Sequence, residues 1–554
     1  MAQPNFLIIL TDDQDSLLGG LQPMEKTRRL LTERGVSFAN AFVATPLCCP
    51  SRASYLTGLY PQSTLTTTNA LRGGCASSSW VDGAERRTFA ALLQRQGYRT
   101  GFSGKYLNNY AMPGSPDCPS WASRSCFRRV PPGWDDWFAL QGNARYYNGR
   151  VSDNGVLRSF GREPADYLPE VFFKRTRGFI EAHLGNRTRQ QPFLARQQPF
   201  LAVLSTPSCH SATLQSAAEP SPAHAGRFRG VRAPRTPNWN ASAAHKHWLM
   251  RRAPPLSAET ARLIDRLHSA RWEALLAVDD QVDELVATLR RWEQLDSTYV
   301  MLTSDHGYQL GQHRRPADKR QPYEHNLRVP LLVAGPAPGV RTRANFSSTA
   351  LVVASIDLAP TLLHLATGTP PAQMDGRSFA HHLMLDGGGG GDGGSGFGSA
   401  AATTTTTRRD FLVVYAGEGQ APCGLAACWC AWVTKKGEPK RADCSTAAAK
   451  RALARGAVRR SGARHLLDAA NNSYACVRTL DAAGAGGGGG DGGGEDTLYC
   501  AFDDDERFVE LYDHRSDPWQ LHNVASAQSA APMARRYAAR LSELRGCRAE
   551  KCRR

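Results

Sequence analysis

The stretch Leu47–Gly58, which reads Leu-Cys-Cys-Pro-Ser-Arg-Ala-Ser-Tyr-Leu-Thr-Gly, organises the chain. Cys48 stands two residues before a proline and four residues before Arg52, and Thr-Gly closes the segment. Pro50 and Ser51 suit the first turn of a helix, where a proline has no backbone hydrogen bond to lose. Two buried cysteines at a helix start would be the structural alternative. The fixed spacing of several residue types favours a functional motif instead.

Upstream of this motif, Phe6–Leu10 is a short, wholly apolar run that leads into Thr11-Asp12-Asp13-Gln14-Asp15. Such a run predicts a strand that is buried on both faces of a parallel sheet. Ligand crevices in open α/β sheets lie beyond the carboxyl ends of the strands, so Asp12 and Asp13 are expected at a binding site. A polar turn with solvated carboxylates would be the interpretation if this stretch stood alone.

Other predicted strands also end in polar residues. The sequence QQPFLA occurs twice, at 190–195 and 197–202, and we assign the strand to the second copy because it continues through Val203 and Leu204. Another strand, Thr298–Thr303, leads into Ser304-Asp305-His306, and the segment Asp318–Glu324 precedes a strand at 329–333. The side chains expected near strand ends or beside them are Lys105, His210, Asp305, His306 and Lys319.

Long amphipathic segments, such as 260–292, are predicted helices that cover this sheet. The C-terminal part has short predicted strands at 411–415, 430–434, 474–479 and 508–512 and a helix at 531–544, which indicates a small antiparallel sheet with a helix. The glycine tracts 387–398 and 484–494 and the threonine run 403–407 are low-complexity and predicted to be disordered. We therefore expect an α/β domain at 1–385, a linker at 386–408 and a small α+β subdomain at 409–554.

The chain has 554 residues, enough for a large core, and a formal net charge of +17. This charge favours anionic partners such as sulfated glycans, nucleic acid or acidic surfaces, although a general bias towards arginine explains it equally well. Fourteen cysteines and the sequons at Asn186, Asn240, Asn345 and Asn471 point to disulfides and a secretory route. The loose cluster Cys423, Cys428 and Cys430 is the one arrangement that suggests zinc.

The apolar run near Met1 leaves no room for a signal peptide, so either the start is truncated or the protein is not secreted. No run approaches the roughly 18 apolar residues that a membrane span needs. We expect neither nucleic acid nor a membrane as a partner.

The segment at Cys48 resembles the sulfatase signature Cys-x-Pro-Ser-Arg followed by Thr-Gly, and the resemblance extends over nearly the whole chain. It is strongest to the family members that act on glucosamine 6-sulfate in heparan-type glycans. The resemblance implies an alkaline-phosphatase-like fold with a mixed, mostly parallel sheet between helices. Further segments that carry it are 104–108, 245–248, 271–272, 278–280, 304–308, 318–324, 474–478 and 510–513.

By this resemblance Cys48, not Cys49, is converted to formylglycine by a formylglycine-generating enzyme, and Cys49→Ala is expected to be mild. The hydrated aldehyde carries two hydroxyls on one carbon, of which one attacks sulfur and the other later releases sulfate. Asp12, Asp13, Asp305 and His306 would bind one divalent ion together with the residue at position 48. Calcium is expected because the ligands are mainly carboxylates, although many sulfatases have Asn where His306 stands.

The resemblance further implies that Arg52 holds the formylglycine hydrate, while Lys105, His210 and Lys319 surround the sulfate. Either His210 or Lys319 would protonate the leaving alcohol. Many sulfatases have a His two residues after the lysine that corresponds to Lys105, but this chain has Leu107 there. The base that releases sulfate is therefore left to His306 or Asn108.

These residues predict a sulfuric ester hydrolase that removes 6-O-sulfate from N-acetylglucosamine-type residues of glycans in the secretory pathway. A broad arylsulfatase is one alternative. A phosphoesterase or phosphonate hydrolase of the same fold is disfavoured by Cys48, because such enzymes normally use two metals and a Ser or Thr nucleophile. A sulfated-glycan-binding protein in which Cys48 is never converted is the alternative without catalysis.

Overall fold

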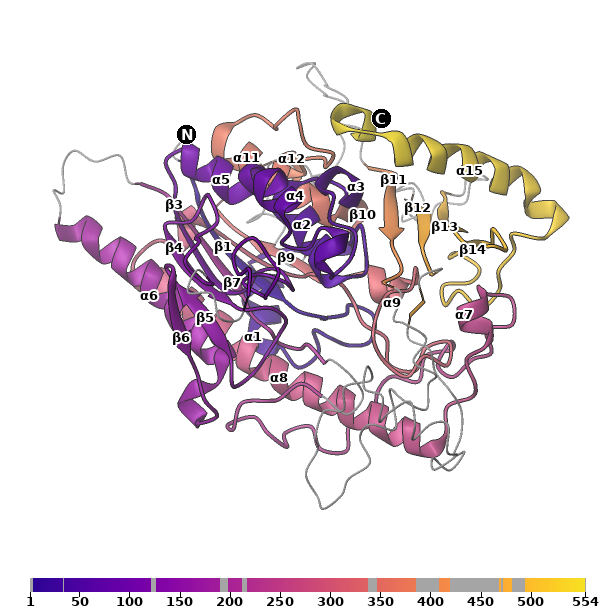
Figure 1. Ribbon diagram of the computed structural model, residues 1–554, viewed down its shortest axis with the longest axis horizontal. Helices are drawn as coiled ribbons and strands as arrows, with labels where there is room; N and C mark the ends of the chain where they lie inside the picture. The colour runs from indigo at the N-terminus through magenta and orange to yellow at the C-terminus, as the bar shows by residue number, and fades with distance from the viewer. Residues whose placement is uncertain are drawn as a thin grey trace, which may run out of the picture.

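The structure is a computed structural model that describes residues 3–32, 34–120, 126–189, 198–211, 217–336, 346–384, 408–418, 468–469, 472–480 and 494–553. Its larger sheet has ten strands and is parallel through its centre (Figure 1). The strand order is β10 (Phe346–Ala354), β2 (Gly35–Phe42), β9 (Leu331–Ala334), β8 (Thr298–Ser304), β1 (Asn5–Thr11), β7 (Phe200–Ser205), β3 (Arg99–Lys105), β4 (Asp136–Leu140), β5 (Arg150–Asp153) and β6 (Val156–Ser159).

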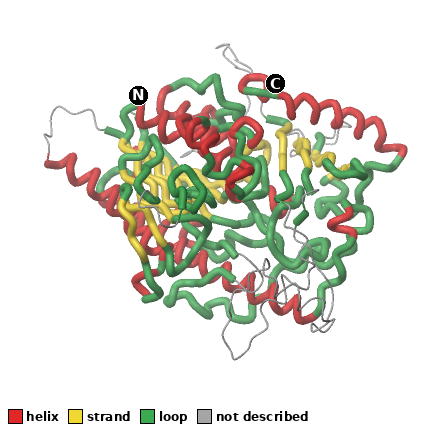
Figure 2. The backbone as a smooth tube through the Cα atoms, viewed as in Figure 1, coloured by secondary structure: helices red, strands yellow, loops and turns green. Residues whose placement is uncertain are grey.

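The central strand β1 is buried on both faces, as its unbroken apolar sequence predicts. Phe6 and Ile8 belong to the core on one side of the sheet, and Leu7 and Ile9 belong to the core on the other. Helices flank the yellow strands on both sides in Figure 2, so the sheet is the middle layer of three. This arrangement confirms the predicted α/β class with a mixed, mostly parallel sheet.

The predicted helix at 260–292 is confirmed as α8 (Ala258–Arg291), whereas α6 and α11 were not predicted. Helices α2, α5 and α11 contribute to one core, and α6 and α8 contribute to the other. The helices are α1 (Glu25–Thr27), α2 (Cys48–Thr57), α3 (Pro61–Thr64), α4 (Ser78–Asp82), α5 (Phe89–Arg95), α6 (Leu168–Arg189), α7 (Trp248–Arg251), α8 (Ala258–Arg291), α9 (Glu324–Leu327), α11 (Leu358–Thr367), α12 (Ala380–Met384) and α15 (Ala531–Gly546). None of them, within the described residues, is both long and apolar enough to cross a membrane.

A second, four-stranded antiparallel sheet with α15 forms the C-terminal part (Figure 1, right). Its order is β11 (Asp410–Tyr415), β12 (Tyr474–Leu480), β13 (Asp496–Phe502) and β14 (Val509–Asp513). The sequence did not predict β13, which the Cys476–Cys500 disulfide joins to β12. The predicted strand 430–434, the Cys423 cluster, the linker 386–407 and the low-complexity tract 484–493 lie outside the described residues.

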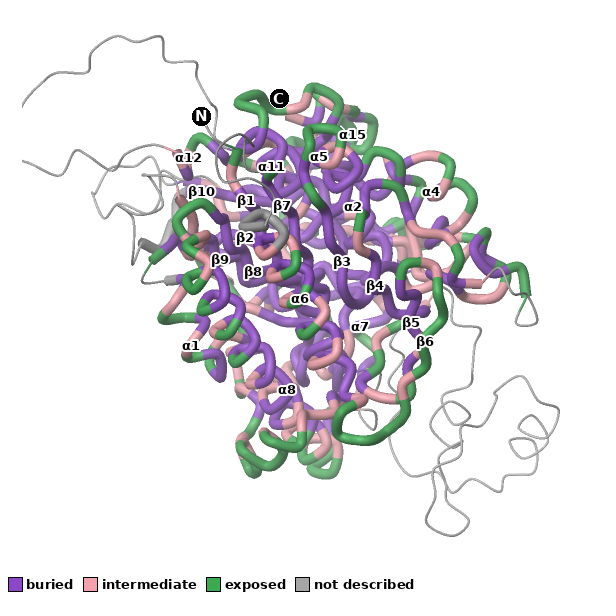
Figure 3. Tube along the Cα trace, turned by 90° about the vertical axis from the view of Figure 1, so that its left-hand side faces the viewer, coloured by how far each residue is buried: buried purple, intermediate pink, exposed green. Residues whose placement is uncertain are grey.

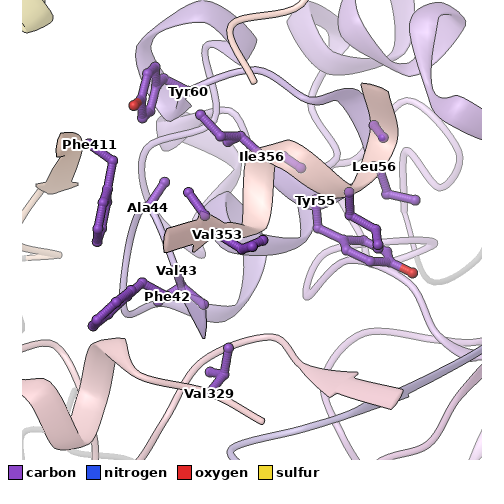
Figure 4. Close-up of a cluster of buried hydrophobic side chains, with 14 of the residues drawn as sticks. Phe42, Val43, Ala44, Tyr55, Leu56, Tyr60, Val329, Val353, Ile356 and Phe411 are labelled. Atoms are coloured by element: carbon purple, nitrogen blue, oxygen red, sulfur yellow. The ribbon is translucent and has the colours of Figure 1, made fainter. Parts of the chain in front are cut away.

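The two sheets share one hydrophobic core. The ring of Phe411 on β11 lies 5.1 Å from that of Phe42 at the end of β2, and the N–H of Val414 donates to the carbonyl of Ala44 at 2.9 Å (Figure 4). Figure 3 shows the buried residues continuing through the middle of the molecule. The C-terminal sheet therefore packs directly against the segment that leads from β2 into α2.

Candidate active site

Helix α2 begins at Cys48 and ends at Thr57, so the whole motif forms one short, fully buried helix. Gly58 ends the helix with a left-handed backbone (φ +68°), and a Cβ there would lie 2.9 Å from the sulfur of Met374. A glycine is therefore required at this position of the motif. The geometry of α2 thus explains the glycine that closes the motif, and it also suits Pro50 in the first turn.

The two adjacent cysteines have different fates. Cys49 forms a disulfide with Cys75, whereas Cys48 and Cys209 are the free cysteines of the described residues. The other disulfides are Cys118–Cys126, Cys476–Cys500 and Cys547–Cys552, which confirms that most cysteines serve as cross-links. The disulfide adds a stability cost to Cys49→Ala, typically about 2–4 kcal/mol, and a mild effect on turnover stays a prediction.

Three carboxylates meet where β1 and β8 end side by side. Asp12 and Asp13 follow β1, Asp305 follows β8, and all three are buried. The backbone N–H of Asp13 donates to Asp305 Oδ1 at 3.1 Å. Parallel pairing of the two strands brings residues almost 300 positions apart into contact, as expected for strand ends in one sheet.

Two lysines neutralise part of this negative charge. Lys105 Nζ donates to Asp12 Oδ2, and Lys319 Nζ donates to Asp13 Oδ1, each at 2.6 Å. Lys105 ends β3, and Gly104 before it has φ +121°, where a Cβ would lie 1.9 Å from the carbonyl oxygen of Ser205. The glycine lets β3 approach β7 closely enough to aim Lys105 at the carboxylates.

Arg52 lies one helical turn after Cys48 on the same face of α2. Its Nε donates to Asp305 Oδ2 at 2.9 Å, and its Nη1 donates to the carbonyl of Lys105 at 2.8 Å and to Ser205 Oγ at 2.9 Å. Nη2 lies 3.4 Å from Asp12 Oδ2 and has no hydrogen-bond partner among the described residues. Arg52 therefore fixes three strand ends and keeps one N–H direction available.

Two histidines approach the thiol of Cys48. His306 Nε2 lies 3.3 Å from Cys48 Sγ, and the side chain of His210 also hydrogen-bonds the thiol. Burial raises the pKa of Cys48, but Lys105, Lys319 and the histidines lower it well below its ordinary value. Burial lowers the pKa of His306, but Asp305 and Cys48 raise it to about 9. The pocket therefore stabilises negative charge at position 48.

The ligand atoms of two overlapping groups lie within 4.8 Å of one another: Asp12, Cys48, Asp305 and His306 in one, and Asp12, Asp13, Cys48 and His210 in the other. Asp12 Oδ1 is buried without a hydrogen-bond partner among the described residues. Burial and the neighbouring Asp12 raise the pKa of Asp305, since crowded carboxylates repel one another. This donor set and the unpaired oxygen fit a divalent cation.

The structure thus gathers every predicted site residue in one buried pocket. Leu107 is fully buried in the core, and the side-chain oxygen of Asn108 has no hydrogen-bond partner in the part of the chain that the structure describes. Sequence reasoning gave no role to Ser205 or to Arg271, whose Nη2 donates to the carbonyl of Asp13 at 2.7 Å. A charged residue within the apolar stripe of α8 is the signal that points to Arg271.

Comparisons with known proteins agree with this geometry. Residues 4–369 match the family model described as "Sulfatase". The chain is 36% identical over 95% of its length to the N-acetylglucosamine-6-sulfatase of Capra hircus, covering 80% of that protein. It is 37% identical over 68% of its length to a putative extracellular sulfatase Sulf-1 homolog of Caenorhabditis elegans, covering 48% of that protein.

A protein solved in complex with its substrate D-glucosamine-2-N,6-O-disulfate has the same fold. It superposes with a TM-score of 0.64 at 19% identity, over 99% of this chain and 98% of that one. The matched family model spans both the cysteine motif and the strand ends that surround it. The chain belongs to the sulfatase family.

Proposed function

We propose that this sulfatase removes the 6-O-sulfate from N-acetylglucosamine-type residues of glycans. The observation that carries the proposal is the 36% identity to a goat N-acetylglucosamine-6-sulfatase, which extends over 95% of the chain and through the C-terminal part. The cluster around Cys48 suits the reaction, because Arg52, Lys105 and Lys319 are buried cations beside Asp12 and Asp13 that would attract an ester sulfate.

Membership of the sulfatase family implies a formylglycine and a divalent metal ion. We assign the formylglycine to Cys48, where its hydrate would supply one hydroxyl to attack sulfur and a second to release sulfate. The ion would be held by Asp12, Asp13, Asp305, His306 and the group at position 48, and we propose calcium because carboxylates are hard oxygen ligands. Bound there, it would offset the negative charge of the sulfate oxygens.

The chain's own cations would bind and orient the sulfate. Lys105 and Lys319 are buried and already point at the carboxylates on either side of Cys48. The unpartnered Nη2 of Arg52 can donate to the hydrate at position 48. Charges fixed in a pocket that excludes water stabilise a developing oxyanion more strongly than water does, since they need not reorganise during reaction.

Two protons must move in this reaction. His210 would donate one to the departing sugar oxygen, with Lys319 as the alternative donor. A base must later take the proton of the second hydroxyl, and the buried Leu107 cannot serve. Neither substitute fits this role, because His306 would be occupied as a ligand of the ion and the amide of Asn108 is not basic, so we assign no base.

We also propose that the protein matures in the secretory pathway, where a formylglycine-generating enzyme converts Cys48. Four disulfides in the described residues suit an oxidising compartment. The nematode relative is named as an extracellular sulfatase. The division into a catalytic domain at 1–385 and a subdomain at 409–554 is likewise our proposal.

The test uses protein co-expressed with a formylglycine-generating enzyme. Mass spectrometry of the peptide that contains Cys48 measures conversion, and sulfate release is followed with N-acetylglucosamine 6-sulfate and with 4-nitrophenyl sulfate. The wild type is expected to hydrolyse both esters. Cys48→Ala should lose activity by a factor on the order of 10⁴ or more, because the nucleophile is removed, and should keep its melting temperature.

Cys209→Ala is the matched control, since Cys209 is the other buried free cysteine of the described residues. It should keep conversion and activity. Hydrolysis of the aryl ester alone would replace the glycan assignment by an arylsulfatase. An unconverted Cys48 with no hydrolysis, together with binding of sulfated glycans, would leave a binding protein.

A further inference from the structure

The loop that carries Lys319 has an unfavourable backbone on both sides of this lysine. Asp318 has φ +93° and Arg320 has φ +90°, backbone angles that residues other than glycine rarely adopt. Each such residue costs on the order of 1–3 kcal/mol and persists only when its surroundings hold it in place. The direction of Lys319 is therefore set by whatever fixes its two neighbours.

Arg320 is fixed by the C-terminal sheet. Its Nη1 donates to the hydroxyl of Tyr415 on β11 at 3.0 Å and to a carboxylate oxygen of Glu418 just after β11. The hydroxyl of Tyr474 on β12 donates to the backbone carbonyl of Arg320 at 3.1 Å. The Nε of Arg320 donates to Asp318 Oδ2 at 2.9 Å, so the two strained residues are also held to each other.

Glu418 reaches the other side of the pocket as well. Its Oε1 accepts the backbone N–H of Asn69 at 2.7 Å, and Asn69 Oδ1 in turn accepts the N–H of Cys49 at 2.9 Å. Cys49 directly follows Cys48. The carboxylate of Glu418 thus binds Arg320 in the Lys319 loop directly and is linked to the start of α2 through Asn69.

We infer that Glu418 and Arg320 are positioning residues, which hold Lys319 and Cys48 at the separation that sulfate ester hydrolysis needs. A displacement of about 1 Å in a catalytic group can cost roughly 10²-fold in rate, so a link between the two sides of the pocket acts on turnover. Glu418 binds through a charge-assisted hydrogen bond to a guanidinium, and such bonds are about twice as strong as neutral ones. The C-terminal sheet is in this way part of the catalytic apparatus.

The test is a double-mutant cycle with 4-nitrophenyl sulfate, whose hydrolysis does not depend on the glycan assignment. Glu418→Gln keeps the shape of the side chain and removes its charge. It should lower kcat about tenfold or more and leave the melting temperature close to that of the wild type. In the Lys319→Met background the same change should lower kcat clearly less than in the wild type, because only the path through Asn69 and Cys49 remains.

Arg540→Met is the matched control. Arg540 pairs with Asp410 on β11 of the same sheet and with Glu543 on its own helix, and neither partner belongs to the Lys319 loop or to α2. It should leave kcat unchanged. Arg320→Lys, which keeps the charge but lacks the planar guanidinium fork that bonds Asp318, Tyr415 and Glu418, is a second variant and should behave as Glu418→Gln does.

Equal losses from Glu418→Gln with and without Lys319 would overturn the inference, as would a rate for Glu418→Gln equal to that of the wild type. Failure of the proposed glycan substrate appears separately. In that case the wild type hydrolyses 4-nitrophenyl sulfate but not N-acetylglucosamine 6-sulfate, and the cycle on the aryl ester still decides the role of Glu418.

Discussion

Two of the buried charge groups in the described residues differ in how they are built. In the active site, Asp12, Asp13 and Asp305 crowd together at the ends of β1 and β8. Where the C-terminal sheet meets α9, by contrast, Glu324 stands between Arg328 and Arg478, which donate to its two oxygens at 2.9 and 2.8 Å.

The pKa directions record this difference. Burial raises the pKa of Glu324, but Arg478 and Arg328 lower it well below its ordinary value. In the active site the cations lower the pKa values of Asp12 and Asp13, but for Asp305 burial and Asp12 raise the pKa, and Arg52 and His306 do not reverse that shift. A carboxylate surrounded by guanidiniums stabilises the fold by itself, whereas carboxylates that face one another repel unless a cation offsets their charge.

Removal of divalent ions should have the largest effect. Exhaustive chelation is expected to lower sulfate release more than about 100-fold, because Asp12, Asp13 and Asp305 then repel one another and the sulfate loses a counter-charge. It should also lower stability, by about 2.7 kcal/mol relative to protein held at 100 times the dissociation constant of the ion. Rates and melting curves with and without calcium measure both effects.

Restoration by added calcium is the control for irreversible damage. Full activity in protein shown by elemental analysis to contain no divalent ion would contradict the metal site. It would also remove the distinction between the two charge groups.

The second prediction concerns the charge group at α9. Arg478→Met should cost about 3–5 kcal/mol of unfolding free energy, because it leaves the buried Glu324 without one of its two partners. Urea denaturation measures this loss. Turnover per folded molecule should not change, since Arg478 contacts no active-site residue in the interactions of the described residues.

Arg515→Met is the matched control for that substitution. Arg515 pairs with Asp513 on the surface of the same sheet and is half exposed, so its loss should cost less than about 1 kcal/mol. Equal costs for the two variants would mean that burial does not strengthen the pair around Glu324.

A third substitution is expected to raise the unfolding free energy. Arg315 is fully buried, and none of its three guanidinium nitrogens has a hydrogen-bond partner among the described residues. Burial lowers the pKa of Arg315 to about 10. Arg315→Leu should therefore raise the unfolding free energy by about 1–3 kcal/mol in urea denaturation. A loss of stability would show that the guanidinium is paired in solution.

The sequence predicts those parts of the fold where burial determines the residue pattern. Phe6–Leu10 and Tyr299–Leu302 are continuous runs of core residues because both faces of β1 and β8 are covered. Strand β2 mixes Gly, Ser and Asn with apolar residues, and β13 directly follows a glycine tract. Neither pattern stands out, so both strands were missed.

The sequence likewise predicts only part of the active site. Residues that directly follow a strand, such as Asp12 and Asp305, are predictable, because parallel strands bring their ends together. The contacts of Glu418 are not, since its partners Asn69 and Arg320 lie about 350 and 100 positions away in the chain and no local pattern relates them.

The last prediction concerns Lys246, a buried cation that lies over the rings of Tyr323 and Tyr512 at 4.1 and 4.3 Å. Its Nζ donates to the hydroxyl of Tyr512 at 2.7 Å. Burial lowers its pKa to about 8, and the attraction of Glu510 and Asp517 offsets burial only in part. Lys246 is thus less readily protonated in the folded chain than in the unfolded chain.

The sign of the pH dependence follows from this difference. Below about pH 8 both states carry the proton, and the folded state bears the full cost of a buried charge. Between about pH 8 and the unfolded pKa of 10.5 the unfolded chain binds more protons, so stability should rise with pH, by roughly 2–3 kcal/mol in total. The pKa values of Tyr323 and Tyr512 are raised well above 10.0 by burial and by Glu510, so neither ring titrates in this window.

Lys246→Met removes the titrating group while Glu510 keeps hydrogen bonds from Tyr323, Tyr512 and the N–H of His247. Urea denaturation of both proteins from pH 7 to 10.5 measures the slope. A slope in Lys246→Met as steep as that of the wild type would assign the titration to another group.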